Sequence, residues 1–261
     1  MIIDLSRAIE NEPAVDPPGF GPSIDYKSHQ QGAAQMVAMF PGLRPEDLPD
    51  GEGWAIEWLT LTPHCGTHVD APWHYASTMN KGERASTIEE LPLDWFFHPG
   101  VKLDFRRLPA GHVVTASELE DAFREISHVP QPFEIVLMNT SAATAYGTPQ
   151  YLASGCGFGR EATLWLCERG VKVVGTDAWS WDVPFSSTRQ RFIDSRDPSI
   201  VWEGHKAGRD HAYCQIEKLA NLDQLPASGF KVACFPVKIK GSSAGFCRAV
   251  AILDESRTVE G

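Results

Sequence analysis

The sequence predicts an α/β protein in which a single domain has a mixed β-sheet core flanked by helices. A strand, helix, strand succession indicates this class. An apolar run at 133–138 contains β-branched residues, a helical segment at 160–169 ends at Gly170, and a second buried strand follows at 171–174. This order is typical of a βαβ unit with a parallel strand pair. The chain has 261 residues, 43% apolar and 22% charged, which suits one large core, so we assign a single domain to 1–261.

The first quarter of the chain predicts a strand, a loop, a helix and a second strand. Residues 2–5 form a short apolar run, and 12–22 are rich in Pro and Gly without periodicity. Residues 32–40 have a helix-forming composition, and we expect a surface helix, with a lid or a pocket wall as the alternative. Over 54–61, the large apolar residues Trp54, Ile56 and Trp58 recur at every second position, and this period predicts a strand that delivers the chain into His64.

The remaining elements complete the expected sheet. Residues 100–105 have the pattern of a strand, and Thr115 with Glu118 forms a capping box that starts a helix. Two apolar segments near the end of the chain, 230–239 and 246–253, predict the closing strands. The stretch 64–74 therefore lies between the predicted strands at 54–61 and 100–105.

Three imidazoles and a carboxylate fall within the eleven residues of this stretch: His64, His68, Asp70 and His74. Prolines bracket the stretch, so we expect an extended chain instead of a helix. All four residues are at even positions and would project from the same face of an extended chain. The pattern predicts a metal site.

His64, His68 and Asp70 together offer two nitrogens and one oxygen, a donor set that suits Zn²⁺ or Mn²⁺ and leaves coordination positions open. An open site is typical of catalysis, because a bound metal lowers the pKa of water and polarises a carbonyl group. His74 would then act as general base or acid, since histidine titrates near neutral pH.

Composition excludes several other classes. The formal net charge of −11 and the lack of a basic stripe argue against nucleic acid as a partner. We expect no membrane association, because no apolar run approaches the length of a span. The N-terminus lacks the pattern of a secretory signal and the six cysteines are scattered, so we expect a cytoplasmic protein with free thiols.

The signature His64-x-Gly-Thr-His68-x-Asp70-x-Pro-x-His74 resembles that of the cyclase-like metal hydrolases, which include bacterial kynurenine formamidase and isatin hydrolase. The resemblance runs along most of the chain and implies a kynurenine-formamidase-like swivelling β/β/α fold. It assigns metal binding to the first two histidines and the aspartate, and proton transfer to His74.

The same resemblance implies a second set of ligands downstream. Glu217, which precedes Lys-Leu, and His205, twelve residues earlier, match a His and Glu that hold a second metal in formamidase-like members, where the motif aspartate bridges. His211 is the competing histidine. Gln215 is a candidate contact for a metal-bound water in a site with one metal. The sequence therefore allows a site with either one or two metal ions.

Aromatic residues and two aspartates complete the candidate site. Asp177 and Asp182 are either loop hydrogen-bonding groups or groups that orient a ligand histidine. Several aromatic residues are candidates for a substrate pocket: Trp73, Trp179, Trp181, Phe185 and Trp202. We expect Trp73 and Trp179, together with Gln215, to contact the substrate.

We therefore expect a metal-dependent amidohydrolase that cleaves an amide or cyclic amide C–N bond of a small, aromatic substrate. The alternatives are a lactone or ester hydrolase or a cyclase on the same site, and a family member that binds metal or ligand without catalysis. The long segments at 12–53 and 179–204 resemble isatin hydrolase more than the small formamidases. The resemblance also implies a homodimer or homotetramer.

Overall fold

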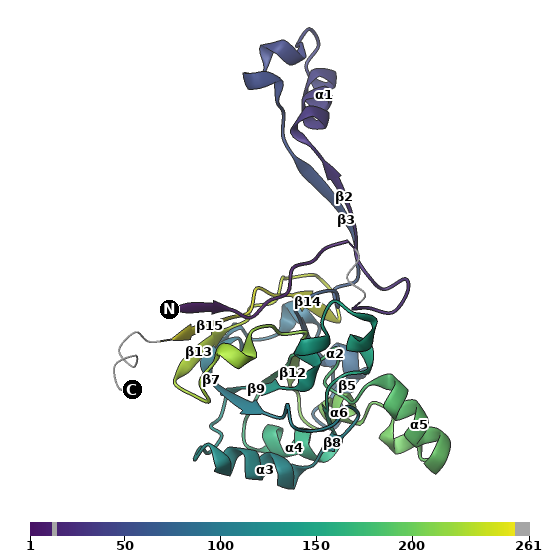
Figure 1. The fold of residues 1–261 in the computed structure, drawn as a ribbon, viewed down its shortest axis with the longest axis vertical. Helices are drawn as coiled ribbons and strands as arrows, with labels where there is room; N and C mark the ends of the chain where they lie inside the picture. Colours follow the sequence, from purple (N-terminus) through teal and green to yellow (C-terminus); the bar gives the residue numbers. More distant parts are fainter. Residues whose placement is uncertain (12–14, 254–261) are drawn as a thin grey trace.

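A curled sheet of nine strands forms the centre of the computed structural model, which describes residues 1–11 and 15–253 (Figure 1). The first residues of the predicted 12–22 loop and the last eight of the predicted domain lie outside the described residues. Four neighbouring strands, β7, β9, β11 and β12, run parallel, and antiparallel strands extend the sheet on both sides. The strands in spatial order are β1 (Ile2–Asp4), β15 (Val250–Leu253), β13 (Phe230–Ala233), β7 (Phe97–Asp104), β9 (Ile135–Asn139), β11 (Val173–Thr176), β12 (Cys214–Glu217), β4 (His68–Asp70) and β14 (Ala244–Phe246).

The curl of the sheet follows from one short connection. Residues 247–249 alone separate β14, at one edge, from β15, which is next to the last strand at the other edge. In a flat sheet these two strands would be roughly 33 Å apart, at about 4.8 Å per strand. Three linking residues span at most about 14 Å. The sheet therefore has to curl until its two ends approach each other.

Apolar side chains cover both faces of this sheet. On one face, helices α3 (Ala116–Glu125) and α4 (Arg160–Glu168) pack against alternate residues of the parallel strands, such as Val136 and Val174. On the other face, the intervening residues, such as Leu137 and Val173, form a second core. The remaining α-helices of the described residues are α1 (His29–Met39), α2 (Pro72–Tyr75), α5 (Phe185–Ser195) and α6 (Glu203–Lys206), and short 3-10 turns occur between the elements. Outside the central sheet, three two-stranded pairs are β2 (Ser23–Lys27) with β3 (Ile56–Thr60), β5 (Thr78–Met79) with β6 (Glu83–Arg84), and β8 (Val113–Val114) with β10 (Gly157–Phe158).

The predicted α/β class with a mixed sheet flanked by helices is confirmed. The unit β9, α4, β11 has the predicted parallel pairing, and α3 begins after Thr115 with the predicted capping box. The expected strand 230–239 ends at Ala233, because Pro236 has no amide hydrogen for the ladder. The expected strand 246–253 is divided between two strands by the crossing at 247–249.

An arm of residues 23–60 projects from the body (Figure 1). It consists of the antiparallel pair β2–β3, with α1 at its far end. The predicted 54–61 strand exists as β3, but it does not join the central sheet and all five of its residues are exposed. The alternative of a lid is wrong for the chain's own site, because α1 lies at the tip of the arm, away from the sheet.

Candidate metal centre

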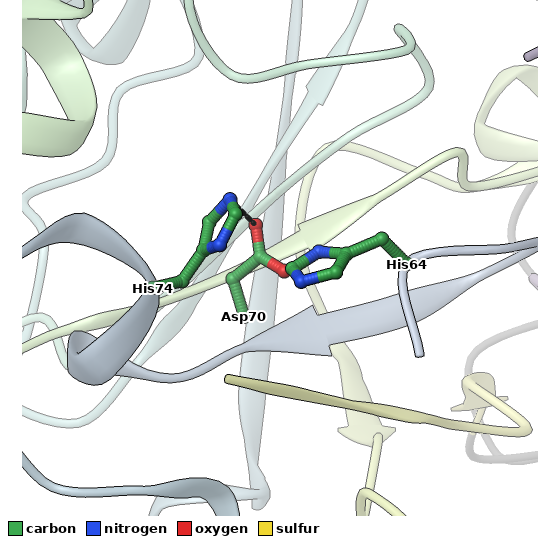
Figure 2. A group of neighbouring side chains, drawn as sticks. All are labelled: His64, Asp70 and His74. Atoms are coloured by element: carbon green, nitrogen blue, oxygen red, sulfur yellow. Dashed lines mark ion pairs between the residues drawn. The ribbon is translucent and has the colours of Figure 1, made fainter. Parts of the chain in front are cut away.

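The 64–74 stretch has three different conformations instead of the single extended one that we expected. His64 lies in a turn where Gly66 has a φ of +58°, β4 begins at His68, and His74 lies on the one-turn helix α2. The expectation of one strand is wrong because the turn and the helix each redirect the chain. They nevertheless bring His64 and His74 to opposite sides of the Asp70 carboxylate (Figure 2).

The pairing of β4 with β12 adds Glu217 to the same face of the sheet. In this antiparallel register Glu217 is directly opposite His68, and Gln215 is opposite Asp70. Cross-strand partners project from the same face, so the two ligand-type side chains meet. Val69, which lies between His68 and Asp70 on β4, points into the core on the other face of the sheet. Glu217 is a buried strand residue.

His205 reaches the centre from the short helix α6, where it is 2% exposed. Its Nδ1 and its backbone N–H both donate to the carboxylate of Asp182. Asp182 therefore orients the ring, while Asp177 accepts from the backbone N–H and hydroxyl of Thr140 and so has the loop role. Beside His205 lies a cavity that His64, His74 and Glu217 also line, and His211 is not among the described residues of its lining.

The distances around Asp70 define one compact constellation. His64 Nδ1 lies 2.8 Å and His68 Nε2 3.2 Å from Asp70 Oδ1. His74 Nε2 and His205 Nε2 each lie 3.9 Å from Asp70 Oδ2. Glu217 closes the group, with its Oε2 3.5 Å from His68 Nε2 and its Oε1 3.7 Å from His205 Nε2. Two triads of side chains with metal-ligand spacing share Asp70: His64, Asp70 and His74, and His68, Asp70 and Glu217.

These residues fit a divalent cation. His68 Nδ1 is 2.9 Å from the Gly66 carbonyl, which requires a proton on Nδ1 and leaves the lone pair on Nε2. His68 Nε2 and both oxygens of Asp70 are buried without a well-aligned hydrogen bond among the residues that the structure describes, and His64 Nδ1 approaches Asp70 Oδ1 only as an ion pair at 2.8 Å. Lone pairs of nitrogen and oxygen that converge in a buried place repel one another unless a cation lies between them. The orphaned atoms are the observation that supports a metal here.

Several side chains of the site have pKa values that differ from their ordinary ones. Burial acts to raise the pKa of Asp70, but the imidazoles of the motif hold it well below its usual range. Burial lowers the pKa of His74 to about 4, and nearby imidazoles add to this effect although Asp70 opposes it. Burial and repulsion by Asp70 raise the pKa of Glu217. At neutral pH His74 is therefore neutral and has a lone pair that accepts a proton.

A cavity of about 230 Å³ opens beside the candidate metal ligands. Three of the predicted aromatic residues line it: Trp179, Phe185 and Trp202. Trp179 contacts Phe185 edge to face, and Trp202 stacks on His205. Trp181 belongs instead to the core, where it is fully buried against Phe158. The lining residues are Asp16, Phe20, Thr62, His64, His74, Trp179, Ser180, Phe185, Trp202, His205, Glu217 and Lys218.

The structure does not bring two of the predicted contacts to this cavity. Trp73 is 41% exposed and lies outside the cavity lining, while its neighbour His74 faces the cavity from the same helix. Gln215 is buried and donates to the Tyr213 hydroxyl at 2.5 Å.

The sequence patterns did not predict five lining residues: Asp16, Phe20, Thr62, Ser180 and Lys218. Asp16 and Phe20 lie in the Pro/Gly-rich segment, where no periodicity marks them. Lys218 follows Glu217, and a lysine at a strand end ordinarily points to solvent.

Fold and site together define an α/β protein with a candidate divalent-metal centre on one face of a curled mixed sheet. Residues 3–183 match the Cyclase family, described as "Putative cyclase". The chain belongs to this family, which confirms the resemblance drawn from the 64–74 signature.

Relatives agree with this membership. Kynurenine formamidase of Erythrobacter litoralis (strain HTCC2594) is 27% identical over 203 residues, which are 78% of this chain and 79% of that protein. Isatin hydrolase A from Ralstonia solanacearum has a similar fold, with a TM-score of 0.75 at 21% identity over 97% of this chain and 92% of the other. Isatin hydrolase A from Labrenzia aggregata superposes with a TM-score of 0.72 at 23% identity, over 98% and 94% of the two chains. Across residues 1–11 and 15–253, no helix has the length and apolarity to cross a membrane.

Proposed function

We propose that this protein is a metal-dependent hydrolase that cleaves an amide or cyclic amide C–N bond of a small aromatic substrate. The orphaned atoms of His68 and Asp70 carry this proposal, because they mark a cation site beside an aromatic cavity. The kinship with kynurenine formamidase and the fold shared with isatin hydrolase support the reaction class.

Five side chains would hold the metal: His64, His68, Asp70, His205 and Glu217. The two oxygens of Asp70 face different imidazoles, which supports two ions that share this carboxylate. A divalent ion, Zn²⁺ or Mn²⁺, would supply activated water and polarise the carbonyl of the substrate. The nitrogen and carboxylate donors suit either metal.

The chain's own groups would do the rest of the work. Neutral His74 accepts a proton at Nε2 and returns it to the leaving nitrogen. Trp179 and Phe185 exclude water from one side of the cavity and bind an aromatic ring edge to face. A volume of about 230 Å³ favours a substrate of one or two rings.

A substrate panel tests this proposal. The protein, loaded with Zn²⁺ or Mn²⁺ to equal occupancy, is offered an aryl formamide, isatin and an aryl lactone. We expect turnover of the formamide or isatin to exceed that of the lactone. Turnover of the lactone alone would make the protein an esterase or lactonase, and bound metal without any turnover would make it a binding protein. Failure to bind either metal would refute the proposal altogether.

We also propose that the protein forms a homo-oligomer through the arm. Seven large apolar side chains of the arm are at least a third exposed, and Trp58 is 65% exposed. At about 150–250 Å² for a large side chain, they leave on the order of 700 Å² for a partner. A standard interface takes about 800 Å² from each partner, so a second copy of this chain would suffice. The seven residues are Tyr26, Met39, Phe40, Trp54, Ile56, Trp58 and Leu59.

A further inference from the structure

Lys218 is a buried lysine in the cavity wall that neither metal binding nor proton transfer uses. It is 2% exposed, and its ammonium pairs with Oδ1 of Asp16 and donates to the backbone carbonyl of His64 at 2.9 Å. A buried ammonium needs a charge partner and hydrogen-bond acceptors, and Lys218 has both. Its contacts join the loop around Asp16 to the turn that contains His64.

The backbone of Lys218 explains how its side chain reaches this place. Consecutive strand residues project from opposite faces, so a continued strand would turn Lys218 away from the side of Glu217. Lys218 instead has a φ of +59°, a left-handed conformation that is unfavourable for a lysine. Two hydrogen bonds hold it, from its N–H to the Ala178 carbonyl at 3.0 Å and from the Thr67 hydroxyl to its own carbonyl at 2.8 Å. Both Glu217 and Lys218 therefore line the same cavity.

Asp16 extends the connection to the aromatic wall. Its Oδ1 also accepts a hydrogen bond from Nε1 of Trp179 at 2.9 Å, and the Lys218 ammonium lies 5.7 Å from the centre of a Trp179 ring. Asp16 has a second oxygen, Oδ2, that is buried without a partner among the described residues. Lys218 is thus the cation that compensates this carboxylate.

We infer that Lys218 and Asp16 form a clasp that positions the substrate-binding wall of the cavity. The clasp ties the 15–20 loop, which carries Phe20, to the indole of Trp179 and to the backbone of His64. Lys218 and Asp16 are positioning residues, since they act through Trp179 and Phe20. This inference rests on the proposed function only for its kinetic readout.

A double-mutant cycle with Lys218→Met and Asp16→Asn tests the clasp in the metal-loaded full chain. Methionine keeps most of the lysine stem without its charge. With whichever panel substrate the protein turns over, we expect either single variant to raise KM about tenfold while kcat stays within about twofold. The KM of the double variant should not exceed that of the single variant with the higher KM, because each residue acts through the other. Lys172→Met, at the opposite end of β11 from the site, is the control and should leave KM unchanged.

Hydrogen exchange gives a readout that needs no activity. In Lys218→Met we expect faster exchange of the 15–20 amides, with helix α3 unchanged and the bound metal retained. If Lys218→Met does not fold, Asp16→Asn carries the same test. Three outcomes would each overturn the inference. The first is a single variant whose amide exchange and KM equal those of wild type, and the second is a double variant whose KM rises by the product of the two single effects. The third is a fall in kcat together with loss of metal. If wild type turns over no substrate, the proposed function fails while exchange still decides the clasp.

Discussion

Asp182 and His205 are joined twice, because the carboxylate of Asp182 accepts both the backbone N–H of His205, at 3.0 Å, and the proton on Nδ1 of its ring. The ring can therefore offer only the lone pair of Nε2, which points toward Asp70 and Glu217. Such a carboxylate–histidine pair fixes the tautomer and the orientation of a metal ligand. The same Asp182 carboxylate accepts from the N–H of Gly204 at 2.8 Å, so the start of α6 is held together with the ring.

Replacement of Asp182 by asparagine should weaken metal binding by about 10- to 100-fold, since the asparagine loses the charge that orients His205. Isothermal titration of the apo-protein with Zn²⁺ measures this change. Asp177→Asn is the matched control, because Asp177 binds Thr140 and no ligand histidine. Equal affinities for both variants would show that Asp182 does not support a ligand.

The sharing of Asp70 predicts how many ions each variant keeps. We expect two equivalents of metal in wild type, one in His205→Ala, and none bound tightly in Asp70→Asn, because both triads need this carboxylate. Elemental analysis of dialysed protein gives the counts. A single equivalent in wild type that survives His205→Ala would reduce the site to one ion.

His74→Gln should lower kcat by about 10²- to 10⁴-fold with metal content unchanged, the usual contribution of a positioned general base. Steady-state kinetics with the preferred panel substrate, together with metal analysis, measure both quantities. Loss of metal from this variant would instead make His74 a ligand, a role that its place in a triad with His64 and Asp70 also allows.

Asp177 predicts a pH dependence of stability. Burial raises the pKa of this carboxyl to about 7, even though Thr140 donates two hydrogen bonds to it. Between about pH 4, where an unfolded aspartate titrates, and pH 7, the folded state binds more protons than the unfolded state. The stability contributed by this group is therefore greatest below about pH 4 and falls as the pH rises to 7.

Asp177→Asn removes this titration. Relative to wild type, we expect the variant to gain on the order of 1–4 kcal/mol between pH 4 and pH 7, as measured by urea unfolding. Asp94→Asn, an exposed position on the body, serves as control. An Asp177→Asn variant whose stability follows the wild-type pH profile would contradict this origin.

Light scattering tests the arm as an oligomer interface. At micromolar concentration wild type should have at least twice the mass of one chain, and Trp58→Ser with Leu59→Ser should shift it toward 28.8 kDa. Leu93→Ser, which changes an equally exposed apolar residue on the body, should not. A wild-type protein that is already monomeric would refute assembly through the arm.

Local periodicity predicted much of the fold. The capping box of Thr115, the buried runs around β9 and β11, and the order strand, helix, strand all express local preferences that survive packing. Local patterns do not show which strands become neighbours. They therefore missed that β3 leaves the body in an arm and that the chain crosses between the sheet ends at 247–249.

The sequence by itself identified His64, His68, Asp70 and His74 as candidate ligands, because four residues of ligand type recur within eleven positions. The turn at Gly66 and helix α2 fold this stretch so that His64 and His74 meet at Asp70. The tertiary structure alone decided what joins them. The β4–β12 register places Glu217 opposite His68, and helix α6 brings His205 to the same place. The left-handed backbone conformation of Lys218 directs its ammonium toward the cavity wall. Strand register and packing depend on the whole core, so a pattern within one stretch cannot specify them.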